Sequence, residues 1–143
     1  MLSLEQAIIT RIRDSVAGFV TVGNASLLAG LRDIGPLLPG CFVIPGGAEP
    51  KQQTVQENAP TLETQEWNII VIVPHQHIDS VDGLTETLAG NLMTGVMQAM
   101  QGKKTTSPHQ RQGFVYQGRE QPTYGIGYAE FPMTFAAQIV VGV

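Results

Sequence analysis

EWNIIVIVP, residues Glu66–Pro74, is the clearest β-strand signal in this chain of 143 residues. Its run of β-branched side chains is typical of a central strand that is covered on both faces near its end. Pro74 ends the strand because proline has no backbone N–H to donate to a neighbouring strand. The rest of the chain is interpreted outward from this strand.

The stretch before this strand, Ile44–Glu66, reads IPGGAEPKQQTVQENAPTLETQE and has no regular pattern. It holds three of the nine prolines and almost no large apolar side chains. Irregular loops of this length are uncommon in compact domains and are usually functional or disordered. Because fixing backbone costs about 1–2 kcal/mol per residue, we expect an arm or long loop over about residues 45–65 that is ordered by other molecules. That expectation favours assembly over catalysis.

Two amphipathic helices flank this region. The first begins at Ser3, which has a capping-box spacing to Gln6, and ends at Gly18. The second runs from about Val81 to Gln101. Apolar residues recur every four positions in both helices: Leu4, Ile8, Ile12 and Val16 in the first, and Leu84, Leu88, Leu92, Val96 and Met100 in the second.

Glycines at positions 90 and 95 weaken the second helix by about 1 kcal/mol each relative to alanine. Such glycines permit close packing on a sheet or on a neighbouring subunit, and packing inside one chain is the more ordinary reason. Asn24 is placed to cap a short helix that extends to Arg32.

Three further segments are predicted to be strands: Cys41–Ile44, a strand that begins at Phe114, and Tyr128–Val141. Pro132 favours an edge position or a bulge for the early part of the last one. The order of elements predicts one α+β domain over residues 1–143. We expect an antiparallel or mixed sheet of about four strands, with helices packed on one face and a long extended arm.

Composition limits the classes of partner. Charged residues make up 14% of the chain, against about 25% in typical soluble domains, and such surfaces are less costly to bury against partners. The net charge of −4 does not favour DNA or an anionic membrane as a partner of the whole molecule. Cys41 stands alone and fits a reducing compartment as a small buried hydrophobe. No signal peptide or bilayer-spanning run is evident.

The sequence contains no convincing catalytic motif, so we predict no catalytic residue, no cofactor and no resident metal. His75 and His77 form an H-x-H pair near Asp79 that suits a metal-binding enzyme, the outside alternative; the ordinary interpretation is polar residues that enter solvent. Glu63 and Glu66 are interpreted as solvated. Trp67 is expected in the core or over the base of the arm.

Two loops carry opposite charge. The basic loop, Lys103–Gln112, contains Lys103, Lys104 and Arg111. The arm is acidic. Opposite signs on separate loops suit head-to-tail contacts between identical subunits, while phosphate contact and simple solvation are the alternatives. The candidate inter-subunit or partner contacts are Glu49, Lys51, Glu57, Glu63, Lys103, Lys104 and Arg111.

The layout resembles the tail terminator, or tail completion, proteins of long-tailed bacteriophages. The resemblance covers most of the chain: the opening helix, the arm at Cys41–Glu66, the strand EWNIIVIVP, the helix LTETLAGNLMTGVMQAMQG (Leu84–Gly102) and the strand YAEFPMTFAAQIVVG (Tyr128–Gly142). The resemblance implies a non-enzymatic α+β subunit of a hexameric ring.

In that family the ring caps the tail tube protein, stops tube polymerisation and presents a surface for head–tail connector or neck proteins. DNA passes through the ring without sequence-specific binding, and no membrane is involved. The resemblance places the protein in the virion tail, and in the bacterial host cytoplasm during assembly. A head–tail joining (neck) or tube-like structural protein is the alternative.

Overall fold

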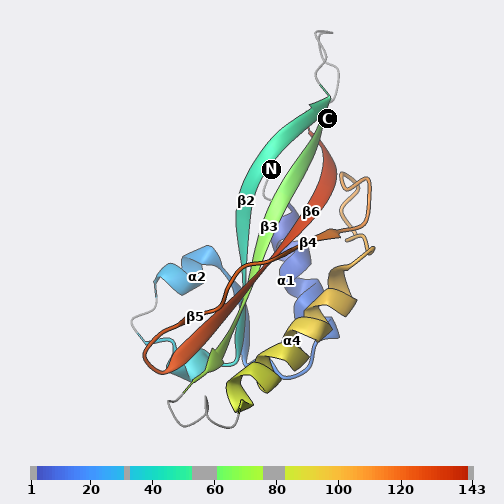
Figure 1. The fold of residues 1–143 in the computed structure, drawn as a ribbon. Coiled ribbons are helices and arrows are strands. Elements are labelled where there is room, and N and C mark those ends of the chain that lie inside the picture. The colour runs from blue at the N-terminus through green and yellow to red at the C-terminus, as the bar shows by residue number, and fades with distance from the viewer. Residues whose placement is uncertain (1–2, 31–32, 53–60, 76–82, 142–143) are drawn as a thin grey trace.

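The computed structural model describes residues 3–30, 33–52, 61–75 and 83–141 (Figure 1). None of the helices in these ranges combines the length and the apolar character needed to cross a bilayer. The elements follow the chain in this order: α1 (Ser3–Ser15), β1 (Thr21–Asn24), α2 (Ala25–Ala29), the 3-10 turn η1 (Gly35–Leu37), β2 (Gly40–Gln52), β3 (Thr61–Pro74), α4 (Leu84–Met100), β4 (Val115–Arg119), β5 (Thr123–Tyr124) and β6 (Tyr128–Val141).

The six strands form one mixed sheet in the order β1-β2-β3-β6-β4, with β5 also paired to β6. β1 runs parallel to β2, and every other pair is antiparallel. The predicted α+β class and mixed sheet are confirmed. The number of strands exceeds the predicted four because two short segments, Thr21–Asn24 and Thr123–Tyr124, also pair.

Helices cover both faces of the sheet, which corrects the expectation of one face. Ile69 and Val71 of β3 belong to the main core, together with residues of α1 and α4. Ile72 points the other way and packs with Leu38 and Phe42, beneath partly buried residues of α2 and the η1 region. The run of consecutive β-branched residues therefore has apolar cover on both sides. The expected burial of Trp67 in the core is confirmed.

The predicted stripe of α1 is buried throughout. In α4 the stripe is wrong at its start, because Leu84 and Leu88 are 58% and 38% exposed. A four-residue spacing drifts by about 40° per step around a helix of 3.6 residues per turn. The buried face therefore begins with Thr85 and Ala89 and reaches Leu92 and Val96 only in the second half.

The prediction of an irregular arm over about residues 45–65 is wrong at both ends, because β2 continues to Gln52 and β3 begins at Thr61. β2 and β3 pair from Gly40↔Ile72 as far as Gln52↔Leu62, with register shifts after Pro45 and after Pro50. The part of the arm between Gln52 and Thr61 lies outside the described residues. β6 continues this ladder to Thr61↔Val141. We name this part of the sheet (residues 44–52, 61–68 and 134–141) the distal sheet, and its far end projects beyond the helices (Figure 1).

Candidate interaction surfaces

The outer edge of β2 is open along the distal sheet, because β1 pairs only with Gly40–Val43. Two prolines stand on this open edge: Pro45 pairs with Trp67 and Pro50 with Glu63 on the inner side. These two partners are an even number of residues apart, so both prolines present the same side of the backbone. Proline is tolerated in a ladder where its missing N–H would face away from the neighbouring strand. We infer that the open edge lacks two of its outward donors.

The opposite edge of the sheet, formed by β4, is also obstructed. The backbone N–H of Tyr116 donates to Oε1 of Gln101 at 2.7 Å. A side chain thus occupies a donor that an added strand would need. Prolines, register shifts and capping side chains are the devices by which proteins prevent edge-to-edge pairing.

Fewer acidic side chains are exposed on the distal sheet than the sequence suggested. Glu49 on β2 and Glu66 on β3 are exposed. Glu63 is only 8% exposed, and its Oε1 accepts a hydrogen bond from Nε2 of Gln65 at 2.8 Å. The expectation that Glu63 is solvated is wrong, because it shares the inward face of β3 with Trp67. Glu57 and the side chain of Lys51 lie outside the described residues.

The basic loop lies against the other side of the distal sheet, along β6. Its backbone joins the strand through Arg111 N donating to the Gln138 carbonyl at 2.8 Å, and through Val140 N donating to the His109 carbonyl at 2.9 Å. The side chains of its three cations, Lys103, Lys104 and Arg111, are all exposed.

Gln110 organises the basic loop from within. It is 2% exposed, its Oε1 accepts from the backbone N and the hydroxyl of Thr105, both at 2.7 Å, and its Nε2 donates to the Gln112 carbonyl at 2.9 Å. The loop is therefore ordered by contacts within its own chain. Sequence analysis missed this residue because a glutamine in a polar tract gives no pattern.

Arg11 of α1 anchors the start of the basic loop. Its guanidinium donates to the carbonyl of Ala99 and, at 3.4 Å, to that of Lys104. The first bond serves one of the carbonyls left without an intrahelical partner at the end of α4. Arg11 thereby ties α1, α4 and the basic loop together.

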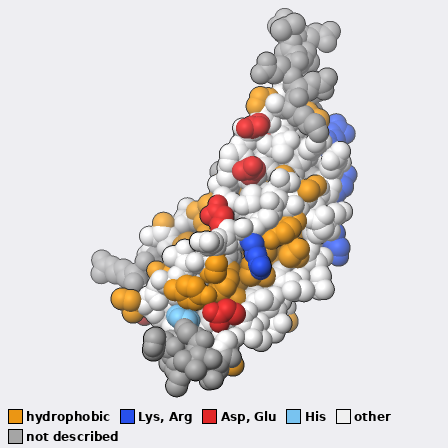
Figure 2. Space-filling view, in the orientation of Figure 1, with side chains coloured by type: hydrophobic (Ala, Val, Ile, Leu, Met, Phe, Trp, Pro, Cys, Tyr) orange, Lys and Arg blue, Asp and Glu red, His pale blue; other side chains and the backbone are white. Residues whose placement is uncertain are grey.

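The two sides of the distal sheet therefore differ in charge. Glu49 and Glu66 lie over β2 and β3, while the cations of the basic loop lie beyond β6. Figure 2 shows basic side chains along one side of the extension and acidic side chains toward the other. The arrangement places Lys103, Lys104 and Arg111 on one side of the distal sheet and Glu49 on the other.

A hollow of about 480 Å³ lies between the first half of α4 and the segment that joins β4 to β5. Tyr124 stands near it, and its hydroxyl donates to Glu86 Oε1 at 2.9 Å. This hydrogen bond is the main cause that raises the pKa of Tyr124 above its ordinary value. The hollow is lined by Glu86, Gly90, Met93, Arg119, Glu120, Gln121, Pro122 and Phe131.

The described side chains that were considered for metal binding or thiol chemistry, His75 and Cys41, make contacts within the subunit. Nδ1 of His75 forms a 2.8 Å hydrogen bond with the Thr85 hydroxyl, and its ring lies against Tyr124. His77 and Asp79 lie outside the described residues. Within the described ranges no three His, Cys, Asp or Glu gather in a metal-binding arrangement. Cys41 is fully buried, and burial raises the pKa of its thiol.

Comparisons with known proteins agree with this architecture. A chain of a structure described as the virion of a native gene transfer agent (GTA) particle has a similar fold, with a TM-score of 0.64 at 14% sequence identity. The similarity covers 96% of this chain and 94% of that one. None of the curated proteins matches the sequence.

The family model described as phage tail terminator protein matches residues 2–143. The protein is thus a structural component of a bacteriophage virion. The chain belongs to the phage tail terminator family, and the resemblance noted in the sequence is confirmed.

Proposed function

We propose that this chain is the subunit of a hexameric ring that caps the tail tube, stops its polymerisation and provides the surface for head or neck attachment. The family match over residues 2–143 supports the terminator role. The proposal of a ring rests on the charge difference between the two sides of the distal sheet. A contact between two different patches on identical subunits is heterologous, and it forms a ring when the rotation closes.

The interface would use the exposed members of the predicted contact set. Glu49 lies on the acidic side, and Lys103, Lys104 and Arg111 lie on the basic side. Glu63 is buried within its own subunit and would act only by supporting β3. In an interface of this kind, complementary charges mainly set the choice and orientation of the partner.

The obstructed sheet edges support a terminator over a tube-like subunit. A subunit that ends growth must engage one neighbour without offering a fresh strand edge to another. Prolines on β2 and the Gln101 cap on β4 both reduce the capacity for strand addition. Contacts would then run through side chains and loops, with tail tube protein on one face of the ring and connector or neck proteins on the other.

The net charge bears on how DNA would traverse the ring. At −4 per subunit, the assembly would repel phosphate on average. We therefore assign the basic loop to protein contact and expect DNA to pass without sequence-specific binding. The protein would act in the virion tail after assembly in the bacterial host cytoplasm.

Negative-stain imaging at high and low protein concentration, with and without purified tail tubes, tests this proposal. We expect closed rings at high concentration and a single added ring at one end of each tube. A particle that stays monomeric at every concentration and ignores tube ends would contradict it. Rings that stack into long tubes would instead favour a tube-like subunit.

A further inference from the structure

Gly90 stands in the interior of α4 without any evident use inside its own subunit. Glycine there weakens the helix relative to alanine. A Cβ built on Gly90 meets nothing within 4 Å, and its backbone is helical. Close packing within the chain therefore does not require this glycine. The space beside it remains open to solvent or to another molecule.

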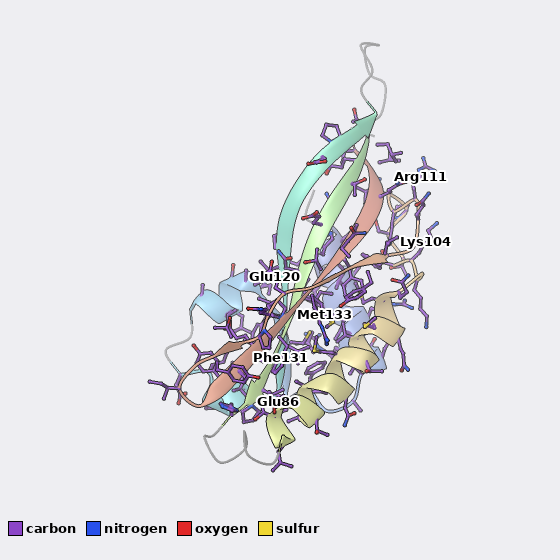
Figure 3. All side chains as sticks on the ribbon, in the orientation of Figure 1. Glu86, Lys104, Arg111, Glu120, Phe131 and Met133 are labelled. Carbon is purple, nitrogen blue, oxygen red and sulfur yellow. The ribbon has the colours of Figure 1, made fainter. Side chains whose placement is uncertain are left out.

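That space belongs to the hollow between α4 and the β4–β5 segment. Met93 and Phe131, which are only 7% and 8% exposed, supply the apolar part of its lining. Figure 3 shows Phe131 between Glu86 of α4 and Glu120 of the β4–β5 segment. The site has an apolar floor, which suits an aliphatic side chain, and a rim that includes the charged residues Glu86, Arg119 and Glu120.

The same chain carries such a side chain elsewhere. Ile126 is 100% exposed at the turn between β5 and β6. The Gly125 N–H donates to the Tyr128 carbonyl at 2.8 Å and closes this turn, and Gly127 has a φ of 84° that favours glycine. Residues 121–128 contain no charged side chain. The turn is therefore held by its own backbone, and it brings no charged side chain of its own into a contact.

We propose that Ile126 of one copy inserts into the hollow beside Gly90 of a second copy. Ile126 is fully exposed, so its side chain has no burial within its own subunit. A projection and a recess at different places on one chain form a heterologous contact, the type that closes into rings. This inference rests on the proposed ring and assigns a second contact to it, separate from the charged sides of the distal sheet.

Replacing the projecting side chain tests the contact. Burial of an isoleucine side chain is worth enough to weaken self-association by about ten- to a hundredfold when it is lost, so we expect that loss in Ile126→Ser. The matched control is Val20→Ser, because Val20 is also exposed, at 61%, and does not line the hollow. Sedimentation across a concentration series measures both variants. Equal association of Ile126→Ser and the wild type would overturn the inference.

Substitutions that fill the hollow test the part of the contact that the second copy contributes. Gly90→Gln places a side chain where nothing in the subunit obstructs it, and Asn91→Gln adds bulk at the adjacent exposed position. We expect Gly90→Gln to associate at least tenfold more weakly while unfolding at the wild-type temperature or above. Asn91→Gln should associate normally. Intact rings from Gly90→Gln that fail to join tubes would assign the hollow to the tube protein and overturn the inference.

Disulfide trapping between copies gives a direct readout. The chain's single cysteine, Cys41, is buried, so it adds no background. A mixture of two single variants, Ile126→Cys and Gln121→Cys, should yield a covalent dimer on mild oxidation. A mixture of Ile126→Cys with Gln98→Cys, an exposed position on α4 outside the hollow lining, should not. Rings without the expected crosslink would refute this contact and leave the proposed function standing; absence of any ring would refute both.

Discussion

Val16, the residue that follows α1, lies so close to Gly95 of α4 that a Cβ at Gly95 would be 2.9 Å from Cγ1 of Val16. Real Cβ atoms do not approach other atoms this closely without a shift of the neighbour. Gly95 therefore lies where the chain leaving α1 packs closely on α4. Packing inside one chain, the more ordinary of the two reasons given for the helix glycines, therefore explains Gly95 but not Gly90.

The two glycines should respond to alanine in opposite ways. Gly95→Ala gains helix propensity but overpacks against a stiff β-branched side chain, so we expect a net loss of about 1 kcal/mol in the free energy of unfolding. Gly90→Ala should gain about 0.5–1 kcal/mol, because its methyl group meets nothing. Urea unfolding followed by Trp67 fluorescence measures both, since this single tryptophan is 1% exposed.

The double variant Val16→Ala with Gly95→Ala supplies the control. Removing the two Val16 methyl groups relieves the overlap, so the two changes should combine less unfavourably than their sum. Additive effects would show that the close approach is not the cause of the loss.

Much of the fold follows from apolar periodicity. The stripe of α1, the strand Glu66–Pro74 and the closing strand are recognisable because apolar residues mark their buried faces. The N-cap of α2 was also predictable, since Asn24 Oδ1 accepts from the backbone N of Leu27 at 2.9 Å. In each case a short-range pattern carries the information.

The start of β3 lacked that signal. Its buried face continues through Glu63 and Gln65, which are joined by a hydrogen bond, so the alternation is carried by polar residues. The same reason hid Gln110. Pro132 was expected at an edge or a bulge, and β6 is an interior strand. The proline pairs with Ile70 and lies between the residues that β5 and β4 cover.

Gln110→Leu should detach the basic loop from β6. A leucine of similar size leaves the Thr105 N–H and the Gln112 carbonyl without their buried partner, at a cost of about 1–3 kcal/mol each if they stay buried. The loop is expected to release instead. Hydrogen exchange at the amides of Arg111 and Val140, which bind across the loop and strand, should accelerate at least tenfold.

Gln112→Leu is the matched comparison for that experiment. Gln112 is exposed, and only its carbonyl takes part in the network, so protection of the two amides should persist. Loss of protection in both variants would indicate that general polarity, and not the buried amide of Gln110, holds the loop.

The thiol of Cys41 should make stability fall in alkaline solution. Burial raises its pKa in the folded protein, whereas an unfolded thiol ionises near its ordinary value of about 8.5. Above that pH the unfolded state loses a proton that the folded state keeps, so stability present at lower pH declines as pH rises. The slope approaches about 1.4 kcal/mol per pH unit. Cys41→Ala should lack this part of the slope between pH 8 and 10, and equal slopes would contradict the assignment.

Charge exchange across the distal sheet should produce subunits that assemble only when mixed. One variant carries Lys104→Glu with Arg111→Glu and so has two acidic sides. The other carries Glu49→Lys with Glu66→Lys and so has two basic sides. Each should remain folded, because the affected side chains are exposed, but should associate poorly with itself since like charges would face each other across the interface.

An equimolar mixture of the two variants should restore rings, because each acidic side then meets a basic side. Such a ring must alternate the variants, so it closes only with an even number of copies, as six would allow. Native mass spectrometry distinguishes an alternating composition from a random one. The rescue should weaken as salt screens the exposed charges, with a Debye length near 10 Å at 0.1 M. Self-assembly of either variant alone, at wild-type concentration, would show that these two sides do not meet.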